Sequence, residues 1–198
     1  VGEIRKKKQA EVLFEAMHTG HSVYSTLHAD TAEQTVRRLV NPPIDVPKTM
    51  VEAVDVNVVM FRDRRRNFRR LMELADISRN EETDEIEANV LYEWQPDEDE
   101  IVKKAESDDK NRTEYRKELS KGSVYHTLKM HTGMTKDEID ENVEEKKDIL
   151  QWMIDKNINE VDEVGNIVAE YYSRPDEVLE IAQKDGDPQK ILKDAPKN

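Results

Sequence analysis

The chain has 198 residues, no cysteine and a formal net charge of −13. The lack of cysteine excludes disulfides and thiolate metal sites, and no apolar run reaches the roughly 18 residues that a membrane-spanning helix needs. Because an acidic surface repels phosphate groups, we expect no nucleic-acid partner and no direct insertion into a membrane.

The charge is divided unevenly along the chain. Residues 1–76 hold 13 Lys/Arg and 11 Asp/Glu, whereas residues 77–198 hold 18 and 33. This change predicts two parts, one over residues 1–77 and an acidic, mainly helical extension over residues 78–198. Simple solubility would also account for the acidic excess.

Strands and helices are expected to alternate over the first 77 residues. The predicted order is a strand end at 1–4, a helix at 10–17, a buried strand at 22–27, a helix from 30 to 40, a short helix at 49–54, and strands at 56–61 and 69–77. Asp30 is the expected N-cap of the 30–40 helix, with Glu33 three residues later. Asn41-Pro42-Pro43 ends that helix. This alternation predicts an α/β fold.

The pattern changes after Ile77. Residues 78–87 are acidic and polar and predict a linker or loop, residues 88–94 predict one more strand, and helical spacing begins near residue 97. One helix is expected to carry Leu119, Val124, Leu128 and Met130, and others cover 135–154, 159–172 and 175–184. Thr135 and Glu138 have the spacing of a capping box. The apolar face of the helix that they open is expected to hold Ile139, Val143, Ile149, Leu150, Met153 and Ile154.

Three polar residues end the first two predicted strands. Glu3 ends one strand, and Thr26 and His28 end the other. Because ligands bind at the carboxyl ends of strands in α/β sheets, neighbouring strands would bring these three side chains to one edge. A carboxylate that orients water, together with a hydroxyl and an imidazole near a γ-phosphate, suits a site that hydrolyses phosphates.

Several segments resemble one known family. They are Gly2-Glu3-Ile4-Arg5, the stretch TGHSVYSTLHA at 19–29, the Arg37-Arg38-Leu39 helix, and Asn41-Pro42-Pro43-Ile44-Asp45-Val46-Pro47 followed by VNVVMF. Their order and spacing resemble the type II and type IV secretion ATPases, the motors of pilus and archaellum assembly, in their archaeal branch. The resemblance covers residues 1–77 well and the remainder loosely.

The resemblance implies a fold and a set of roles. It implies part of a RecA-like P-loop NTPase core over residues 1–77, with the end of the Walker B strand and the histidine box. Glu3 would be the general base or the residue that positions water. Thr26 and His28, with His21 behind them, would couple the γ-phosphate to the subunit interface, and Gly20 would permit a tight turn.

The resemblance also implies cofactors and partners. The intact parent would use ATP and Mg²⁺, assemble as a hexameric ring and act on a membrane platform protein. It would be cytoplasmic and held peripherally at the inner face of the cell membrane by its partners. The expected activity is ATP hydrolysis coupled to protein export or filament assembly.

The chain departs from the family pattern in two places. Lys6-Lys7-Lys8-Gln9 stands where the family usually has Gly or Asp and then Glu. No G-x-x-x-x-G-K-[ST] motif occurs in the sequence, so the backbone cradle for phosphates, its lysine and the Mg²⁺-binding hydroxyl are missing. We therefore expect a fragment that begins after this loop, binds ATP and Mg²⁺ weakly and turns over no ATP alone.

Other interpretations of the same residues stay open. The chain could be a non-catalytic helical interaction or assembly module that carries a degenerate ATPase half. His18 and His21 form an H-x-x-H pair, but we expect no metal site because a third ligand is missing. The six arginines within residues 62–70 favour a solvated hairpin tip or a contact with an acidic protein surface over nucleic acid.

Overall fold

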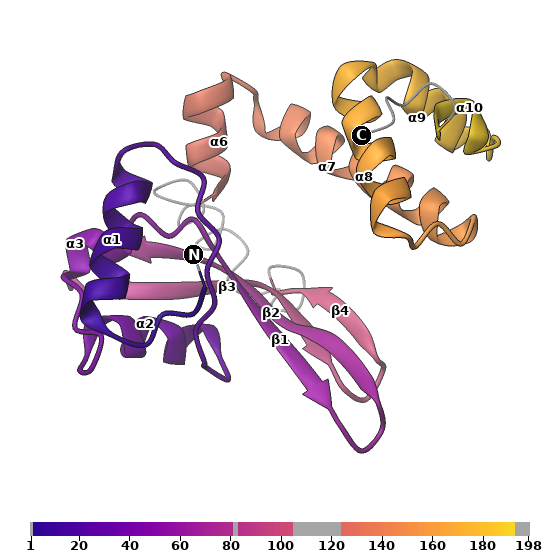
Figure 1. Ribbon diagram of the computed structural model, residues 1–198. Coiled ribbons are helices and arrows are strands. Elements are labelled where there is room, and N and C mark those ends of the chain that lie inside the picture. The colour runs from indigo at the N-terminus through magenta and orange to yellow at the C-terminus, as the bar shows by residue number, and fades with distance from the viewer. Residues whose placement is uncertain (1, 81–82, 105–123, 193–198) are drawn as a thin grey trace. The chain divides into compact units, whose positions relative to one another are not determined.

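The computed structural model describes residues 2–80, 83–104 and 124–192 (Figure 1). The chain divides into two compact units, Val1–His131 and Thr132–Asn198. The expected boundary at residue 77 lies inside a strand of the first unit, so the change in charge does not coincide with the division between units.

Three helices precede the sheet in the first unit. They are α1 (Lys7–His18), α2 (Ala32–Val40) and α3 (Lys48–Val51). The N-cap of α2 is Thr31, and the expectation of Asp30 was wrong. The Thr31 hydroxyl accepts a hydrogen bond from the Gln34 amide at 3.1 Å, which satisfies one of the free amides in the first turn. The Asp30 amide instead donates to the Gln34 side chain.

The sheet of the first unit has four antiparallel strands in the order β1-β2-β3-β4. Their bounds are β1 (Val56–Asp63), β2 (Phe68–Arg79), β3 (Ile86–Gln95) and β4 (Glu100–Lys103). The three helices gather at the end of the sheet where β1 begins, and the turn between β1 and β2 lies at the far end (Figure 1). The predicted hairpin and the predicted strand near 88–94 are confirmed.

Two expectations about residues 78–103 need correction. The linker or loop expected at 78–87 is shorter than predicted, because β2 continues to Arg79 and β3 begins at Ile86. Ile77 and Ile86 are both buried, which holds the two strands together close to their turn. Helix was expected from residue 97, but β4 pairs with residues 92–95 of β3. The sequence of β4 is half charged, so its strand form depends on this pairing and not on an apolar pattern.

The buried strand expected at 22–27 is only an isolated bridge. Glu3 and Thr26 form a parallel pair, in which the Ile4 amide donates to the Thr26 carbonyl at 2.8 Å and the Thr26 amide donates to the Gly2 carbonyl at 3.4 Å. A strand needs neighbours to extend its ladder, and the described residues supply none beyond this pair. The mixture of helices and strands is as expected, whereas the RecA-like core stays a prediction.

Two apolar clusters hold the helices of the first unit against the sheet, a large one and a small one of Ala32, Val59 and Ala75. Ala10, Leu13 and Phe14 lie on one face of α1, at helical spacing, and Phe14 has no exposed surface. Ile4 belongs to the large cluster and is 8% exposed. Because Ile4 is anchored in the core, the residue on each side of it is held in place at the surface.

The second unit is helical. It contains α7 (Lys136–Asp155), α8 (Val161–Ser173), α9 (Pro175–Gln183) and α10 (Gln189–Leu192), and α6 (Val124–Thr132) ends at the division between the units. The predicted capping box of Thr135 and Glu138 is confirmed. In the described part of the chain, no helix combines the length and the apolar character that crossing a membrane requires.

The apolar face predicted for α7 was partly wrong. Ile139, Ile149 and Met153 are buried, but Val143, Leu150 and Ile154 are exposed. The three exposed residues repeat at their own helical spacing, so α7 carries a second, exposed apolar stripe. The segment around Leu119, which was expected to be helical, lies outside the described residues.

Candidate functional site

The backbone around Glu3 is fixed from two sides. The Gly2–Ile4 segment is bonded to Thr26 through the parallel bridge, and the Ser25 hydroxyl donates to the Gly2 carbonyl at 2.6 Å. Ile4 lies in the core, so Glu3 and Arg5 both stand on the outer side of the segment. Core packing and main-chain bonding therefore hold the segment before any ligand binds.

The Glu3 carboxylate contacts two basic side chains, one with each oxygen. His28 Nε2 lies 3.2 Å from Glu3 Oε1, and Arg5 Nη2 donates to Glu3 Oε2 at 2.5 Å. The Glu3 side chain is 22% exposed, whereas His28 is 83% exposed. The structure thus brings Glu3 and His28 together, and it places the imidazole toward solvent, where a ligand can reach it.

The surroundings of Glu3 favour its ionised form. The hydrogen bond from Arg5 and the charges of Arg5 and His28 lower the pKa of Glu3, although partial burial acts in the opposite direction. A general base works best when its pKa lies near the operating pH. A carboxylate with a low pKa is better suited to orient water or an imidazole than to remove a proton.

Arg5 is the residue whose contact the sequence did not reveal. Its guanidinium makes the shortest polar contact of Glu3, and the ion pair raises the pKa of Arg5. The signal was the spacing: in an extended segment, residues two apart lie on the same face. Since Ile4 is apolar and buried, Glu3 and Arg5 must both lie on the outer face of the segment.

The other expected residues surround the site in different ways. Thr26 pairs with Glu3 through the main-chain bridge, and Thr26 itself is exposed. Gly20 has φ +84°, a left-handed conformation that favours glycine, and it ends α1. The amides of Gly20 and His21 donate to the carbonyls of Met17 and Ala16, a Schellman arrangement.

The two histidines of the H-x-x-H pair have separate contacts. His18 Nδ1 lies 2.8 Å from the Phe14 carbonyl, and His21 Nδ1 lies 3.0 Å from the Thr19 hydroxyl. Across the residues whose positions are given, no group of three or more His, Asp or Glu side chains could hold a metal ion. Because Thr19 is the C-cap residue of α1, its contact with His21 holds that side chain at the end of the helix.

Comparison with known proteins supports the resemblance seen in the sequence. Residues 1–147 match the family described as Type II/IV secretion system protein. The chain is 29% identical over 179 residues to the uncharacterized protein MJ0900 of Methanocaldococcus jannaschii, covering 88% of this chain and 30% of that protein. It is 33% identical over 102 residues to MJ1287 of the same organism, covering 50% of this chain and 37% of that protein.

A bacterial relative has a stated activity. The Type IV pilus assembly ATPase PilB of Pseudomonas aeruginosa is 43% identical over 60 residues, which are 30% of this chain and 10% of PilB. The chain thus spans about a third or less of the length of these relatives. Because the family match covers most of the chain, the protein belongs to the type II/IV secretion system protein family.

Proposed function

We propose that this chain is the C-terminal part of a secretion or pilus-assembly motor ATPase, in which ATP hydrolysis drives protein export or filament assembly. The observation that carries the proposal is the contact between Glu3 and His28 beside the parallel bridge to Thr26. Membership of the secretion family and the similarity to a pilus-assembly ATPase support it.

Each site residue has a role that its geometry allows. Glu3, ionised at neutral pH, orients the attacking water and holds the His28 imidazole through Nε2. His28 and Thr26 contact the γ-phosphate and pass its presence to the subunit interface. Gly20 and His21 shape the turn that leads from α1 into this segment.

The residues of this chain do not make up a complete site for ATP and Mg²⁺. The sequence has no G-x-x-x-x-G-K-[ST] motif, which would supply backbone amides, a lysine and a hydroxyl to the phosphates and the metal. We expect that loop to come from outside the 198 residues, and we expect the chain alone to hydrolyse no ATP. The side chains of this chain therefore define no catalytic step that uses Mg²⁺.

The partners follow from the proposed motor. A hexameric ring would place the site of one subunit next to its neighbour, and a membrane platform protein would receive the motion. Peripheral attachment at the inner face of the cell membrane would come through such partners. A non-catalytic assembly module is the competing function, and it is favoured by Lys6-Lys7-Lys8 directly after the candidate site.

The test is phosphate release by the intact gene product that contains these residues. Glu3→Gln keeps the shape of the side chain and removes its charge, so we expect turnover to fall about 10²-fold or more. Glu11→Gln, at an exposed position on α1, is the matched control and should leave turnover unchanged. ATP binding, measured separately, should survive in both variants.

Two results would overturn the proposal. If the intact product hydrolyses ATP equally well with Glu3→Gln, the carboxylate has no part in turnover. If the intact product neither binds nor hydrolyses ATP, the non-catalytic module is the better description. Turnover by the 198-residue chain alone, lost with Glu3→Gln, would show that the site needs no further loop.

A further inference from the structure

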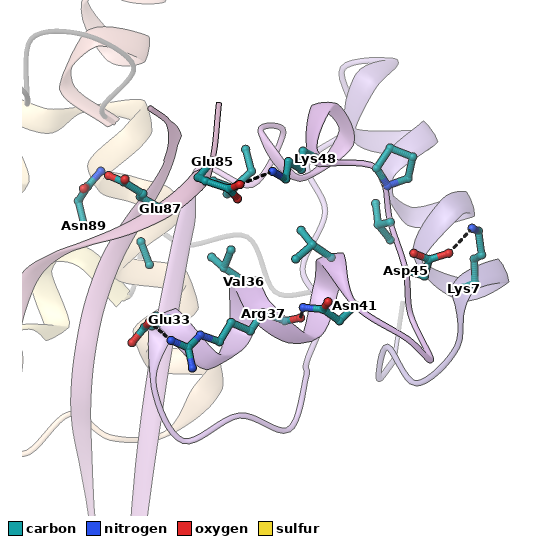
Figure 2. Close-up of a pocket in the computed structure, with 15 residues that line it drawn as sticks. Lys7, Glu33, Val36, Arg37, Asn41, Asp45, Lys48, Glu85, Glu87 and Asn89 are labelled. Carbon is teal, nitrogen blue, oxygen red and sulfur yellow. Dashed lines mark hydrogen bonds and ion pairs between the residues drawn. The ribbon is translucent and has the colours of Figure 1, made fainter. Parts of the chain in front are cut away.

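A cavity of about 830 Å³ lies in the first unit (Figure 2), and neither Glu3 nor His28 lines it. Its two long walls are α2 and the beginning of β3, and the segment between α2 and α3 closes one end. The volume lies within the 300–1,000 Å³ that ligand pockets usually span. The proposed ATPase site does not use this cavity.

The wall formed by β3 is the edge of a strand. Five consecutive residues, 85–89, line the cavity, although neighbouring side chains of a strand point to opposite faces. A run of consecutive residues can line one cavity only if the main chain itself borders it. β2 pairs with one edge of β3 from residue 86 onward, whereas β4 pairs with the other edge only at residues 92–95. Among the described strands, none pairs with that second edge at 86–89.

The wall formed by α2 is one face of a helix. Glu33, Val36, Arg37 and Val40 line the cavity at spacings of three and four residues. The apolar lining comes from both walls and from the end of the cavity: Val36, Val40, Val46, Pro47, Ile86 and Ala88. A groove between a strand edge and a helix face offers main-chain donors and acceptors on one side and apolar surface on the other.

Six of the seven charged residues that line the cavity are paired with one another, and the seventh, Glu87, accepts a hydrogen bond from Asn80. Lys7 Nζ lies 2.9 Å from Asp45 Oδ2, and Lys48 Nζ lies 2.7 Å from Glu85 Oε1 (Figure 2). Arg37 is bonded to Glu33 at 2.6 Å. Because each of these cations has an acidic partner, the groove has little net attraction for a phosphate or another free anion.

We infer that this groove binds an extended peptide segment of a partner protein, which adds as a strand to β3 at residues 86–89. Main-chain hydrogen bonds supply the affinity in this mode, and pockets for alternate side chains supply the specificity. Four residues of strand span roughly 13 Å, so the segment would have about four residues in contact, with apolar side chains at alternate positions toward α2. An unpaired strand edge beside an apolar helix face fits this occupant better than an anion or a compact ligand.

The test begins with a phage-displayed library of random 12-residue peptides, selected on the purified 198-residue chain. Selected peptides are synthesised, and hydrogen–deuterium exchange is measured with and without them. We expect slower exchange at alternate amides within 86–89 and no change at the hairpin tip, residues 64–67. N-methylation of alternate peptide amides should weaken binding about tenfold or more, since it removes the donors that face β3.

Two variants separate the groove from the remaining surface. Val40→Glu places a carboxylate on the apolar wall and should weaken binding about tenfold or more. Val161→Glu, at an exposed position in the second unit, should have no effect. Thermal melting confirms that both variants fold. The N-methylation experiment changes only the peptide, so its result does not depend on either variant. Raising NaCl from 0.05 to 0.5 M should change the Kd less than about threefold, because six of the seven charged residues that line the cavity are paired with one another.

Several outcomes would overturn the inference. They are a selection that yields no peptide binding tighter than about 100 μM, binding without protection at 86–89, and N-methylated peptides that bind as well as their parents. Sedimentation at low and high protein concentration tests whether a second copy of the chain occupies the groove instead of a peptide. If the chain dimerises and the dimer protects 86–89, a second copy fills the groove and the peptide is excluded.

Discussion

Asp76 is the buried charged residue whose replacement tests the packing of the first unit most directly. It lies in β2 with 1% of its surface exposed. Asn89 donates a hydrogen bond to Oδ1 at 2.9 Å, but Oδ2 has no hydrogen-bond partner among the described residues. Burial raises the pKa of Asp76, and the amides of Asn89 and Val124 offset part of that rise.

The raised pKa sets the sign of the pH dependence. The folded state holds the Asp76 proton to a higher pH than the unfolded state does. The stability that this group contributes is therefore complete below its unfolded pKa of about 3.9, and it is lost as the pH rises through the folded-state pKa. A buried polar group left without a partner costs about 1–3 kcal/mol, with charged groups at the upper end.

Asp76→Asn removes the charge and keeps an oxygen to accept from Asn89. We expect the free energy of unfolding of this variant, relative to the parent, to rise by about 1–3 kcal/mol between pH 4 and pH 7. Urea unfolding at both pH values measures it, in a Trp152→Phe background so that Trp94 reports on the first unit alone. Asp55→Asn, at an exposed position before β1, is the control and should stay within about 0.5 kcal/mol. Parallel pH curves for the parent and Asp76→Asn would refute the reasoning.

Two further predictions concern the ends of the other elements. Thr135→Ala removes the N-cap of α7 and should lower the stability of the second unit by about 1 kcal/mol, measured by thermal melting of circular dichroism. Hydrogen bonds from Thr135 lower the pKa of Glu138, so the Glu138 contribution should be present above its unfolded pKa and fade as the pH falls through the folded-state value. In the turn between β3 and β4, hydrogen bonds from Arg70 and Trp94 lower the pKa of Asp99 to about 2. In Arg70→Leu the carboxyl carbon shift of Asp99 should titrate at a higher pH than in the parent, and an unchanged midpoint would show that Arg70 is not the cause.

Features that depend on residues close in sequence could be predicted. The capping box at Thr135, the hairpin of β1 and β2 and the end of α2 before Asn41 each rest on contacts within a few residues. The error at the start of α2 was of the same local kind. Asp30 and Thr31 are both good caps, and the choice between them depends on one peptide unit of backbone conformation.

Features that depend on distant partners could not be predicted. Residues 22–27 have the composition of a buried strand, but composition does not supply the neighbouring strands that a ladder requires. On α7, Val143 and Leu150 satisfy a helical repeat as well as Ile149 does. Which stripe is buried is decided by α8 and α9, whose packing onto α7 cannot be deduced from the period of either helix.

The candidate site also combines features that the sequence could predict with features that it could not. The proximity of Glu3 and His28 followed from the ends of two adjacent segments, because the parallel bridge alone is enough to bring them together. The position of His21 did not follow, since the Schellman turn at Gly20 directs it to Thr19. The low pKa of Glu3 needed the three-dimensional contact with Arg5.

The way in which Glu3 is held has a consequence for how the proposed motor would work. Ile4 packs with Leu13 and Phe14 in the core, and the same segment is bonded to Thr26, so none of these contacts needs a nucleotide. Both oxygens of Glu3 are engaged by Arg5 and His28 in this arrangement. Each carboxylate oxygen can accept a second hydrogen bond, so Glu3 keeps acceptor sites for a water molecule while Arg5 and His28 stay in place. In the proposed ATPase, then, both the backbone of the site and the contact of Glu3 with His28 are formed in advance, and Glu3 would orient the water without giving up His28.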